Sequence, residues 1–142
     1  NLEHTAHSPH YYYHKFDPED EKSHRRSIYR FVVRSQPNPF MTTLDCADSS
    51  QSTPKRNETL TALQALSLLN NKFTLVMARH FADRLAGEEE KITRQVELGF
   101  ELVAGRPPSA EEQNLLAEYA SKHGMANLCR SLFSLSEFAF ID

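Results

Sequence analysis

The sequence predicts a mainly α-helical protein whose helices lie in the second part of the chain. Five of the seven prolines fall within the first 54 residues, whereas all four glycines follow residue 86. Proline lacks the amide donor that a helix interior needs, and glycine commonly stands at a helix end. Apolar residues after residue 58 recur at intervals of three and four, as on the buried face of a helix. We therefore expect a bundle of about five helices after residue 58, preceded by an irregular, proline-rich half with at most one or two short strands.

The proline-rich half contains one stretch with the composition of a strand, residues 25–35. Its aromatic and β-branched side chains occupy every second position and suit a pleated surface. A short helix is almost equally compatible with this stretch. Pro37 and Pro39 follow it and are expected to break any regular structure, because each also restricts the residue before it.

The helical part divides at its glycines, asparagines and prolines. The five expected helices span residues 59–70, 72–86, 88–104, 109–124 and 125–135. Gly87 is expected to end the second helix, and the acidic residues 88–90 to open the third, where the helix dipole favours negative charge. Ser109 and Glu112 have the spacing of a capping box at the start of the fourth.

The expected core faces follow from helical spacing. They contain Phe73, Met77, Phe81 and Leu85 in the second helix, and Ile92, Val96, Phe100 and Val103 in the third. A chain of 142 residues is within the range of one domain. We expect a single domain over residues 1–142, with a histidine-rich segment at 1–24, an extended segment at 25–58 and a helical body at 59–142. Because the chain begins with asparagine, we expect it to be a fragment or a processed product of a larger protein.

Composition restricts the function. A net charge of −3 gives no basic excess of the kind that nucleic-acid binding needs. No apolar run approaches the ~20 residues that a membrane span requires. The two cysteines, Cys46 and Cys129, form no C-x-x-C or C-x-x-C-H motif, which argues against a zinc ribbon or covalent haem. We expect no cofactor, and we expect two separate, mostly buried thiols, although one bridge between them is compatible with an oxidising compartment.

The polar segment before the first long helix is the main candidate site. Asp45, Asp48 and Arg56 lie within twelve residues of one another, together with Cys46 and Lys55. The carboxylates could act as general acid and base, and Arg56 could bind an anion. The alternative, which we favour, is a structural clamp in which these groups satisfy backbone amides and Asn57 or Thr59 caps the helix. Asp45 or Asp48 would then pair with Arg56 or with Arg26 or Arg30.

Two further clusters carry weaker signals. His4, His7 and His10 recur every three residues, a spacing that would align metal ligands on a helix, but Pro9 interrupts the run. We expect no more than adventitious metal binding there. A basic cluster at Arg25, Arg26, Arg30 and Arg34 follows the acidic residues 17–21. We expect mutual neutralisation, with a phosphate or sulfate site as the alternative.

Three stretches resemble one known family. They are HRRSIYRFVVRSQPNPFMTTLDCADSSQSTPKRNETLTALQALSLLNN, ELVAGRPPSAEE and LCRSLFSLSEFAFID. They resemble the uncharacterised C-terminal domain of large planctomycete proteins that carry cytochrome-c-like modules. The resemblance implies an exported bacterial protein, periplasmic or extracellular, whose haem belongs to other modules. It implies no catalytic residue.

Two functions remain open at this level. The first is a non-catalytic helical scaffold or interaction module whose partners are other domains of the same polypeptide. The second is a hydrolase acting on polysaccharide through Asp45 and Asp48, because glycoside hydrolysis uses two carboxyl groups across the scissile bond. Carbohydrate is therefore a further candidate partner, whereas nucleic acid is not expected.

Overall fold

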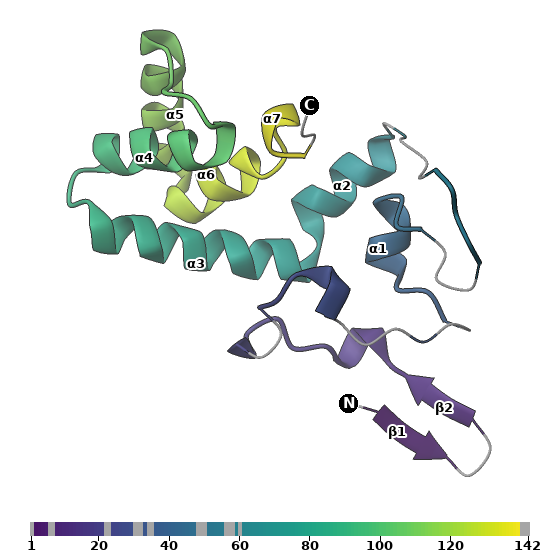
Figure 1. Ribbon diagram of the computed structural model, residues 1–142. Helices are drawn as coiled ribbons and strands as arrows, with labels where there is room; N and C mark the ends of the chain where they lie inside the picture. Colours follow the sequence, from purple (N-terminus) through teal and green to yellow (C-terminus); the bar gives the residue numbers. More distant parts are fainter. Residues whose placement is uncertain are drawn as a thin grey trace. The chain divides into compact units, whose positions relative to one another are not determined.

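The structure is a computed structural model of the 142-residue chain (Figure 1). It describes residues 2–5, 8–21, 24–29, 33, 36–47, 51–55, 59 and 61–139. Only the backbone is described at residues 2–5, 8–11 and 14. Contacts divide the chain into two compact units, Asn1–Ser67 and Leu68–Asp142. The prediction of a single domain over residues 1–142 is not tested by this division and stays a prediction.

The prediction of a mainly α-helical protein is confirmed. Within the described residues, the helices after residue 58 are α2 (Ala62–Asn70), α3 (Lys72–Glu88), α4 (Ile92–Ala104), α5 (Ala110–His123), α6 (Met125–Leu132) and the short α7 (Ser136–Ala139). The first unit contains α1 (Pro39–Thr43) and the short 3₁₀ helices η1 (Tyr13–Lys15) and η3 (Ser27–Tyr29). Strands β1 (Leu2–Thr5) and β2 (Ser8–Tyr11) pair antiparallel, with Leu2 opposite Tyr11 and Thr5 opposite Ser8.

Of the two alternatives for residues 25–35, the described part of the stretch forms the short helix and not the strand. Ser27–Tyr29 forms η3, and Val33 makes only an isolated bridge with Gln36. The Tyr29 amide donates to the Arg26 carbonyl at 3.0 Å, so a local turn satisfies the backbone groups that a strand would have to pair with a neighbour. Strand composition describes a side chain's fit to a sheet, and it does not supply the partner strand.

Pro39 begins a helix, contrary to the prediction that it breaks regular structure. It occupies the first turn of α1, where its missing amide costs no intrahelical hydrogen bond. Asn38 is the N-cap, and its side-chain oxygen accepts from the amides of Phe40 at 3.0 Å and Met41 at 3.2 Å. The sequence N-P therefore specifies a helix start here.

Two other contacts tie described parts of the first unit together. The Tyr13 hydroxyl donates to the Gln36 carbonyl, and His24 Nε2 lies 2.8 Å from the Pro18 carbonyl oxygen. Pro18 itself is buried. These contacts connect residues that are 23 and 6 positions apart in the sequence.

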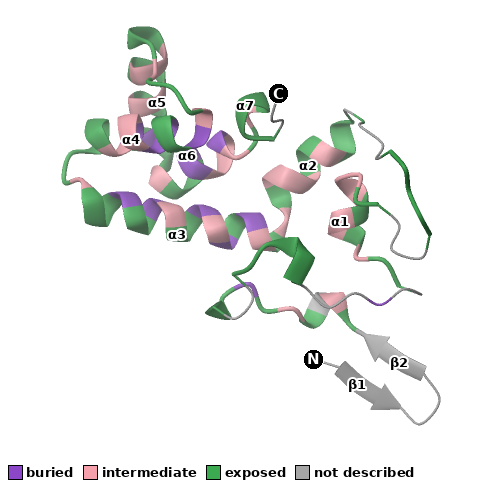
Figure 2. Cartoon of the chain, in the orientation of Figure 1, coloured by how far each residue is buried: buried purple, intermediate pink, exposed green. Residues whose placement is uncertain are grey.

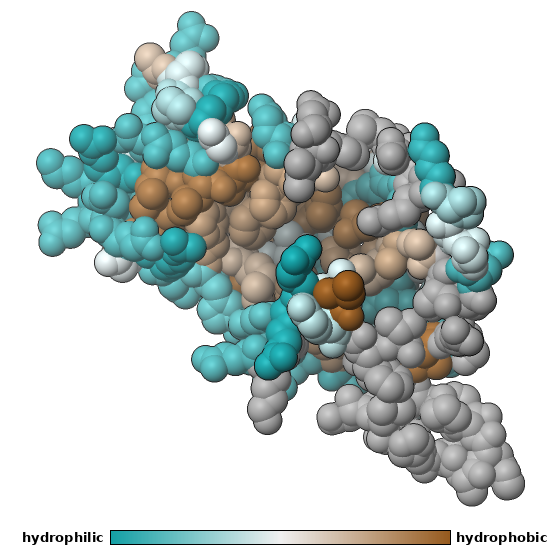
Figure 3. All heavy atoms as spheres, viewed as in Figure 1, coloured by the Kyte–Doolittle hydropathy of each residue, from teal (hydrophilic) through white to brown (hydrophobic). Residues whose placement is uncertain are grey.

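The core of the second unit lies between α3, α4, α5 and α6. Figure 2 shows buried residues on α3, α4 and α6, and Figure 3 shows apolar side chains gathered over α4 and α6. One buried cluster consists of Val96, Phe100, Val103, Ala120, Leu128 and Leu132, and the other of Ala78, Ala82, Leu85 and Cys129. Three of the four predicted α4 core residues are buried, but Ile92 is 39 % exposed. In α3 only Leu85 of the predicted four is fully buried, because the small side chains of Ala78 and Ala82 face the core instead.

The predicted ends of α3 and α4 are also corrected. Gly87 lies inside α3, and the helix ends after Glu88, where the amide of the C-cap Glu89 donates to the Leu85 carbonyl at 3.0 Å. The acidic residues 88–90 therefore precede α4, which begins at Ile92 with no acidic side chain in its first turn. A glycine near a helix end does not stop the helix unless its backbone takes the left-handed conformation. Gly105 takes it at the end of α4, with φ of 70°.

The start of α5 is confirmed as a capping box and has an additional ionic partner. Ser109 Oγ accepts from the Glu112 amide at 3.2 Å, and the Glu112 carboxylate accepts from the Ser109 amide at 2.7 Å. Arg106 donates to both oxygens of the same carboxylate at 2.9 and 2.8 Å, and lies 3.6 Å from Glu137. Its guanidinium also covers the Phe100 ring, 4.8 Å from the centroid. Arg106 thus connects the α4–α5 loop to α4, α5 and α7.

We expect Gly99→Ala to lower the free energy of unfolding by about 1–3 kcal/mol. A Cβ at Gly99 would lie 2.9 Å from Cδ1 of Leu85, which is 0 % exposed, so the buried end of the Leu85 side chain would have to shift. Gly87→Ala is the matched control, because a Cβ there meets nothing within 4 Å, and helix propensity should raise stability by up to about 1 kcal/mol. Urea unfolding followed by far-ultraviolet circular dichroism measures both. A Gly99→Ala protein as stable as the parent would contradict this packing.

Glu112 should contribute a pH-dependent stabilisation. Hydrogen bonds from Arg106 and Ser109 lower the pKa of Glu112 to about 2 from its ordinary 4.5. Because the folded-state pKa is the lower one, the stabilisation is present above about pH 4.5 and is lost as the pH falls towards 2. The stability difference between the parent and Glu112→Gln, measured by urea unfolding, should therefore shrink over this range. Arg106→Gln should reduce this pH dependence and leave the part that the Ser109 hydrogen bond supplies, whereas an equal difference at pH 3 and pH 7 would disprove the assignment.

Candidate functional site

The candidate site is built on the start of α2. Thr61 precedes the helix, and its Oγ1 accepts from the Gln64 amide at 3.2 Å while Gln64 Oε1 accepts from the Thr61 amide at 2.9 Å. This reciprocal pair is a capping box with glutamine as the third helical residue. The prediction that Thr59 caps the helix is therefore wrong, and the other predicted cap, Asn57, lies outside the described residues. The T-x-x-Q spacing of Thr61 and Gln64 is the sequence signal that identifies Thr61 as the N-cap.

Asp45 supports this helix start from a distant part of the sequence. Its Oδ2 accepts from the Thr59 amide and the Thr59 hydroxyl, each at 2.7 Å, and from Gln64 Nε2 at 2.9 Å. Gln64 Nε2 also donates to Thr59 Oγ1 at 2.8 Å. These bonds join residues 14 and 19 positions apart in the sequence. They also place a negative charge near the N-terminal end of α2, where the helix dipole favours it.

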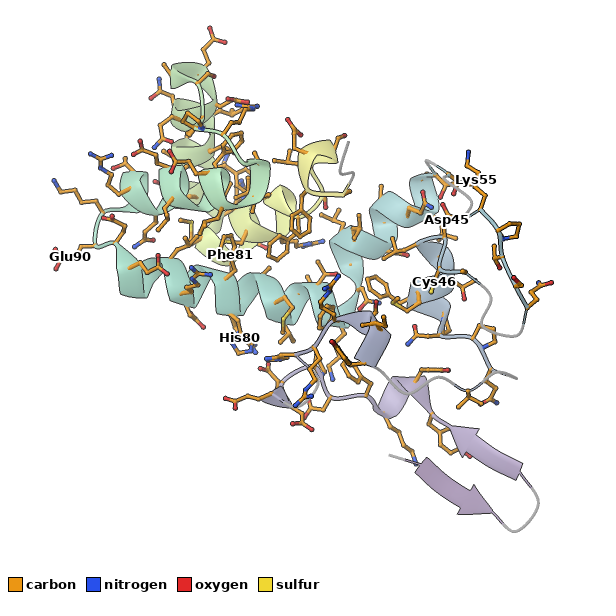
Figure 4. The ribbon with its side chains drawn as sticks, in the orientation of Figure 1. Asp45, Cys46, Lys55, His80, Phe81 and Glu90 are labelled. Atoms are coloured by element: carbon orange, nitrogen blue, oxygen red, sulfur yellow. The ribbon has the colours of Figure 1, made fainter. Side chains whose placement is uncertain are left out.

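The backbone at Asp45 serves a second purpose. Its φ of 56° is in the left-handed region, and it is the one non-glycine residue with positive φ among the described residues. Asp45 follows Leu44, the C-cap of α1, and its amide donates to the Thr42 carbonyl at 3.2 Å. Aspartate tolerates this conformation better than most residues. One residue therefore closes α1 through its backbone and supports α2 through its carboxylate (Figure 4).

The chemistry of the Asp45 carboxylate follows from these partners. Among the described residues, Thr59 and Gln64 donate three hydrogen bonds to one oxygen of this carboxylate. Charged acceptors form stronger hydrogen bonds than neutral ones, so this geometry suits an anion that holds two segments together. The described contacts agree with the structural-clamp hypothesis for Asp45.

Several predicted site residues lie outside the described part of the chain. They are His7, Arg30, Asp48 and Arg56. The hypotheses that pair Asp45 with Asp48 in catalysis, or Arg56 with either carboxylate, remain predictions. Arg26 and Lys55 are described and are exposed.

The described part of the histidine run lies in strands and not in a helix. His4 lies in β1 opposite Pro9, and His10 lies in β2 opposite Glu3. The side chains of His4 and His10 are outside the description, so their metal-binding role stays a hypothesis. Among the residues that are described, no group of three or more histidine, cysteine, aspartate or glutamate side chains could hold a metal ion.

The two cysteines are separate thiols, as expected, but they differ in burial. Cys129 is 0 % exposed in the core of the second unit, and burial raises the pKa of its thiol to about 12. Cys46 is exposed, so its predicted burial is wrong. Its position on the loop directly after α1 explains this, because loops of this kind run over the surface (Figure 4).

The fold and the Asp45 network together define a mainly helical module whose described polar side chains chiefly cap and connect helices. No helix in the described part is long and apolar enough to cross a membrane. The family PSD1, described as protein of unknown function (DUF1553), matches residues 2–120, and the chain belongs to this family. This confirms the resemblance to an uncharacterised domain. No curated protein and no solved structure matches the sequence.

We expect Asp45→Asn to lower the free energy of unfolding by about 1 kcal/mol, because the amide retains the shape but loses the charge that strengthens the three hydrogen bonds. Asparagine also accepts the left-handed backbone, so the change isolates the carboxylate. Asp83→Asn, on the exposed face of α3, is the matched control and should change stability by no more than about 0.5 kcal/mol. Urea unfolding of both proteins is the measurement, and equal stabilities would contradict the clamp.

Proposed function

We propose that the protein is a non-catalytic helical scaffold or interaction module. The observation that carries this proposal is the hydrogen bonding of the Asp45 carboxylate, the central polar group of the candidate site. In the described part of the chain, Thr59 and Gln64 donate three hydrogen bonds to Asp45 Oδ2. A general base has to place its oxygen within hydrogen-bonding reach of a substrate proton. An oxygen that already holds the helix start in this way is better suited to stabilising the fold.

The setting that we propose is a larger exported bacterial protein, of the planctomycete, cytochrome-c-associated kind. This part of the proposal is supported by the sequence resemblance over residues 24–71, 101–112 and 128–142. Membership in PSD1 supports the coarser statement that the domain belongs to a family of unknown function. The partners in this proposal are other domains of the same polypeptide.

The alternative is a hydrolase acting on polysaccharide through Asp45 and Asp48. It needs two carboxyl groups on opposite sides of a glycosidic bond, ~5–10 Å apart. Only Asp45 of this pair is described, and its contacts favour the structural role. An assay for polysaccharide hydrolysis distinguishes the two functions.

We expect the purified chain to release no reducing ends from polysaccharides above the buffer blank. The substrates should include neutral and acidic polymers, and the parent should be compared with Asp45→Asn and Asp48→Asn. Hydrolysis by the parent that disappears in both variants, while their circular dichroism spectra stay unchanged, would establish the enzyme and overturn the module. Far-ultraviolet circular dichroism of each protein provides the control for folding.

A further inference from the structure

The turn at η3 exposes two large apolar side chains. Ile28 is 80 % exposed, more than any other large hydrophobic residue in the described part of the chain, and Tyr29 is 73 % exposed. Exposed hydrophobic residues are common singly, but here two adjacent residues of one turn are both largely exposed. Over this turn, Figure 3 shows strongly hydrophobic atoms directly beside hydrophilic ones.

The backbone explains why the turn cannot cover these side chains itself. A 3₁₀ helix has about three residues per turn, so successive side chains point in three different directions. Ser27, Ile28 and Tyr29 therefore cannot share one buried face. The hydrogen bond from the Tyr29 amide to the Arg26 carbonyl, at 3.0 Å, brings Arg26 to the same side of the turn as Tyr29.

Two arginines lie close in sequence to Ile28 and Tyr29. Arg25 and Arg26 are exposed, and in the described part of the chain neither guanidinium makes a hydrogen bond or an ion pair. The acidic residues 17–21 lie close in sequence and are themselves described, but they form no ion pair with these two arginines. Arginine presents a planar fork that binds carboxylates through two hydrogen bonds. The charge on this turn therefore fits an anionic partner.

We propose that Arg25, Arg26, Ile28 and Tyr29 form a docking surface for an acidic polypeptide segment that also carries an apolar side chain. The composition is that of an interface hot spot, where tyrosine and arginine are enriched around a buried apolar contact. A partner protein can contact more than one face of this turn, as the different directions of Ile28 and Tyr29 require. Its carboxylates would pair with the two guanidinium groups.

Other anionic partners fit less well. A sulfated or acidic polysaccharide could stack on Tyr29 and pair with Arg26, but it offers no apolar pocket for Ile28. A lipid bilayer could accept both apolar side chains. However, even one myristoyl chain gives only marginal membrane binding, and Ile28 and Tyr29 present far less apolar surface.

This inference rests on the proposed function, because it names the partner of an interaction module. A segment of the same polypeptide would meet the docking surface at a high effective concentration, often millimolar for a short flexible connection. A contact that is weak between separate molecules would then be occupied. The hydrolysis assay above tests the absence of catalysis, whereas the experiment below tests the surface, so each can fail without the other.

The chain contains no tryptophan, which permits a single fluorescent reporter. Tyr29→Trp places that reporter in the docking surface, and excitation near 295 nm selects it over the tyrosines. The probe is the random copolymer of glutamate and tyrosine, titrated at low salt. We expect the emission of the introduced tryptophan to move to shorter wavelength on binding. The affinity should fall at least tenfold between low and physiological salt, because surface charges are screened.

Matched variants locate the effect. In the Tyr29→Trp background, Arg25→Ala with Arg26→Ala should weaken binding at least tenfold, and Ile28→Ser should weaken it severalfold. Lys91→Ala with Lys122→Ala removes the same charge from exposed positions of the second unit and should leave binding unchanged. Tyr119→Trp, on exposed α5, is the reporter control and should show no shift. Circular dichroism verifies that each variant is folded.

Three outcomes would overturn the proposal. The first is no shift at any copolymer concentration that permits measurement. The second is an equal loss from the arginine and lysine pairs, which would show general attraction to a polyanion. The third is a larger shift with dextran sulfate, or with vesicles of phosphatidylcholine and phosphatidylglycerol, at matched charge concentration. That result would assign the surface to a polysaccharide or to a membrane.

Discussion

The second unit depends on the close approach of α3 and α4 at Gly99. With no side chain at that position, Leu85 of α3 fills the space against α4 and becomes fully buried. Leu132 of α6 would also lie 3.8 Å from a Cβ at Gly99, so three helices meet at one point. Protein interiors are packed to the density of organic crystals, and such a meeting point tolerates little added volume. The two buried clusters of this unit extend from it, one toward α5 and α6 and the other along α3.

The first unit is held together differently. Among its described residues, Val33 and Pro18 are buried, whereas most side chains are exposed or half-buried. Polar contacts join several of its described segments: Asp45 with Thr59 and Gln64, Tyr13 with Gln36, and His24 with Pro18. Polar contacts of this kind contribute less per residue than a packed core, since each replaces hydrogen bonds to water. The same unit carries the exposed turn at Ile28 and Tyr29.

The features that the sequence predicts well are those that depend only on residues close together in the chain. The capping box of Ser109 and Glu112, the glycine after α4 and the stripe of Val96, Phe100 and Val103 all depend on spacing within one helix. Pro39 was misjudged because its effect depends on position, and Asn38 before it supplied the missing information. Thr61 and Gln64 were also visible as a T-x-x-Q pattern, although Thr59 was predicted as the cap.

The rest depends on contacts that spacing does not encode. The sequence marked Asp45 as a clamp residue, but its partners are 14 and 19 positions away. Burial is similarly non-local. Helical periodicity does not distinguish Phe81, which is half-buried, from Ala82, which is buried, because the difference depends on which neighbouring helix lies against each side chain. The same cause explains why the described residues of 25–35 form no strand, since a strand requires a partner that its own sequence does not specify.

The contrast between the two thiols makes the chain its own reporter of unfolding. The thiolate is the form that reacts with alkylating and disulfide reagents. Cys46 is exposed, so a reagent reaches it in the native protein. Cys129 is enclosed and its pKa is raised to about 12, so it reacts only when the helices around it separate. Mass spectrometry after alkylation therefore distinguishes two forms of the chain. The native protein is labelled at Cys46 alone, and protein whose second unit has opened is labelled at both cysteines. Labelling of Cys46 also shows that the reagent was active.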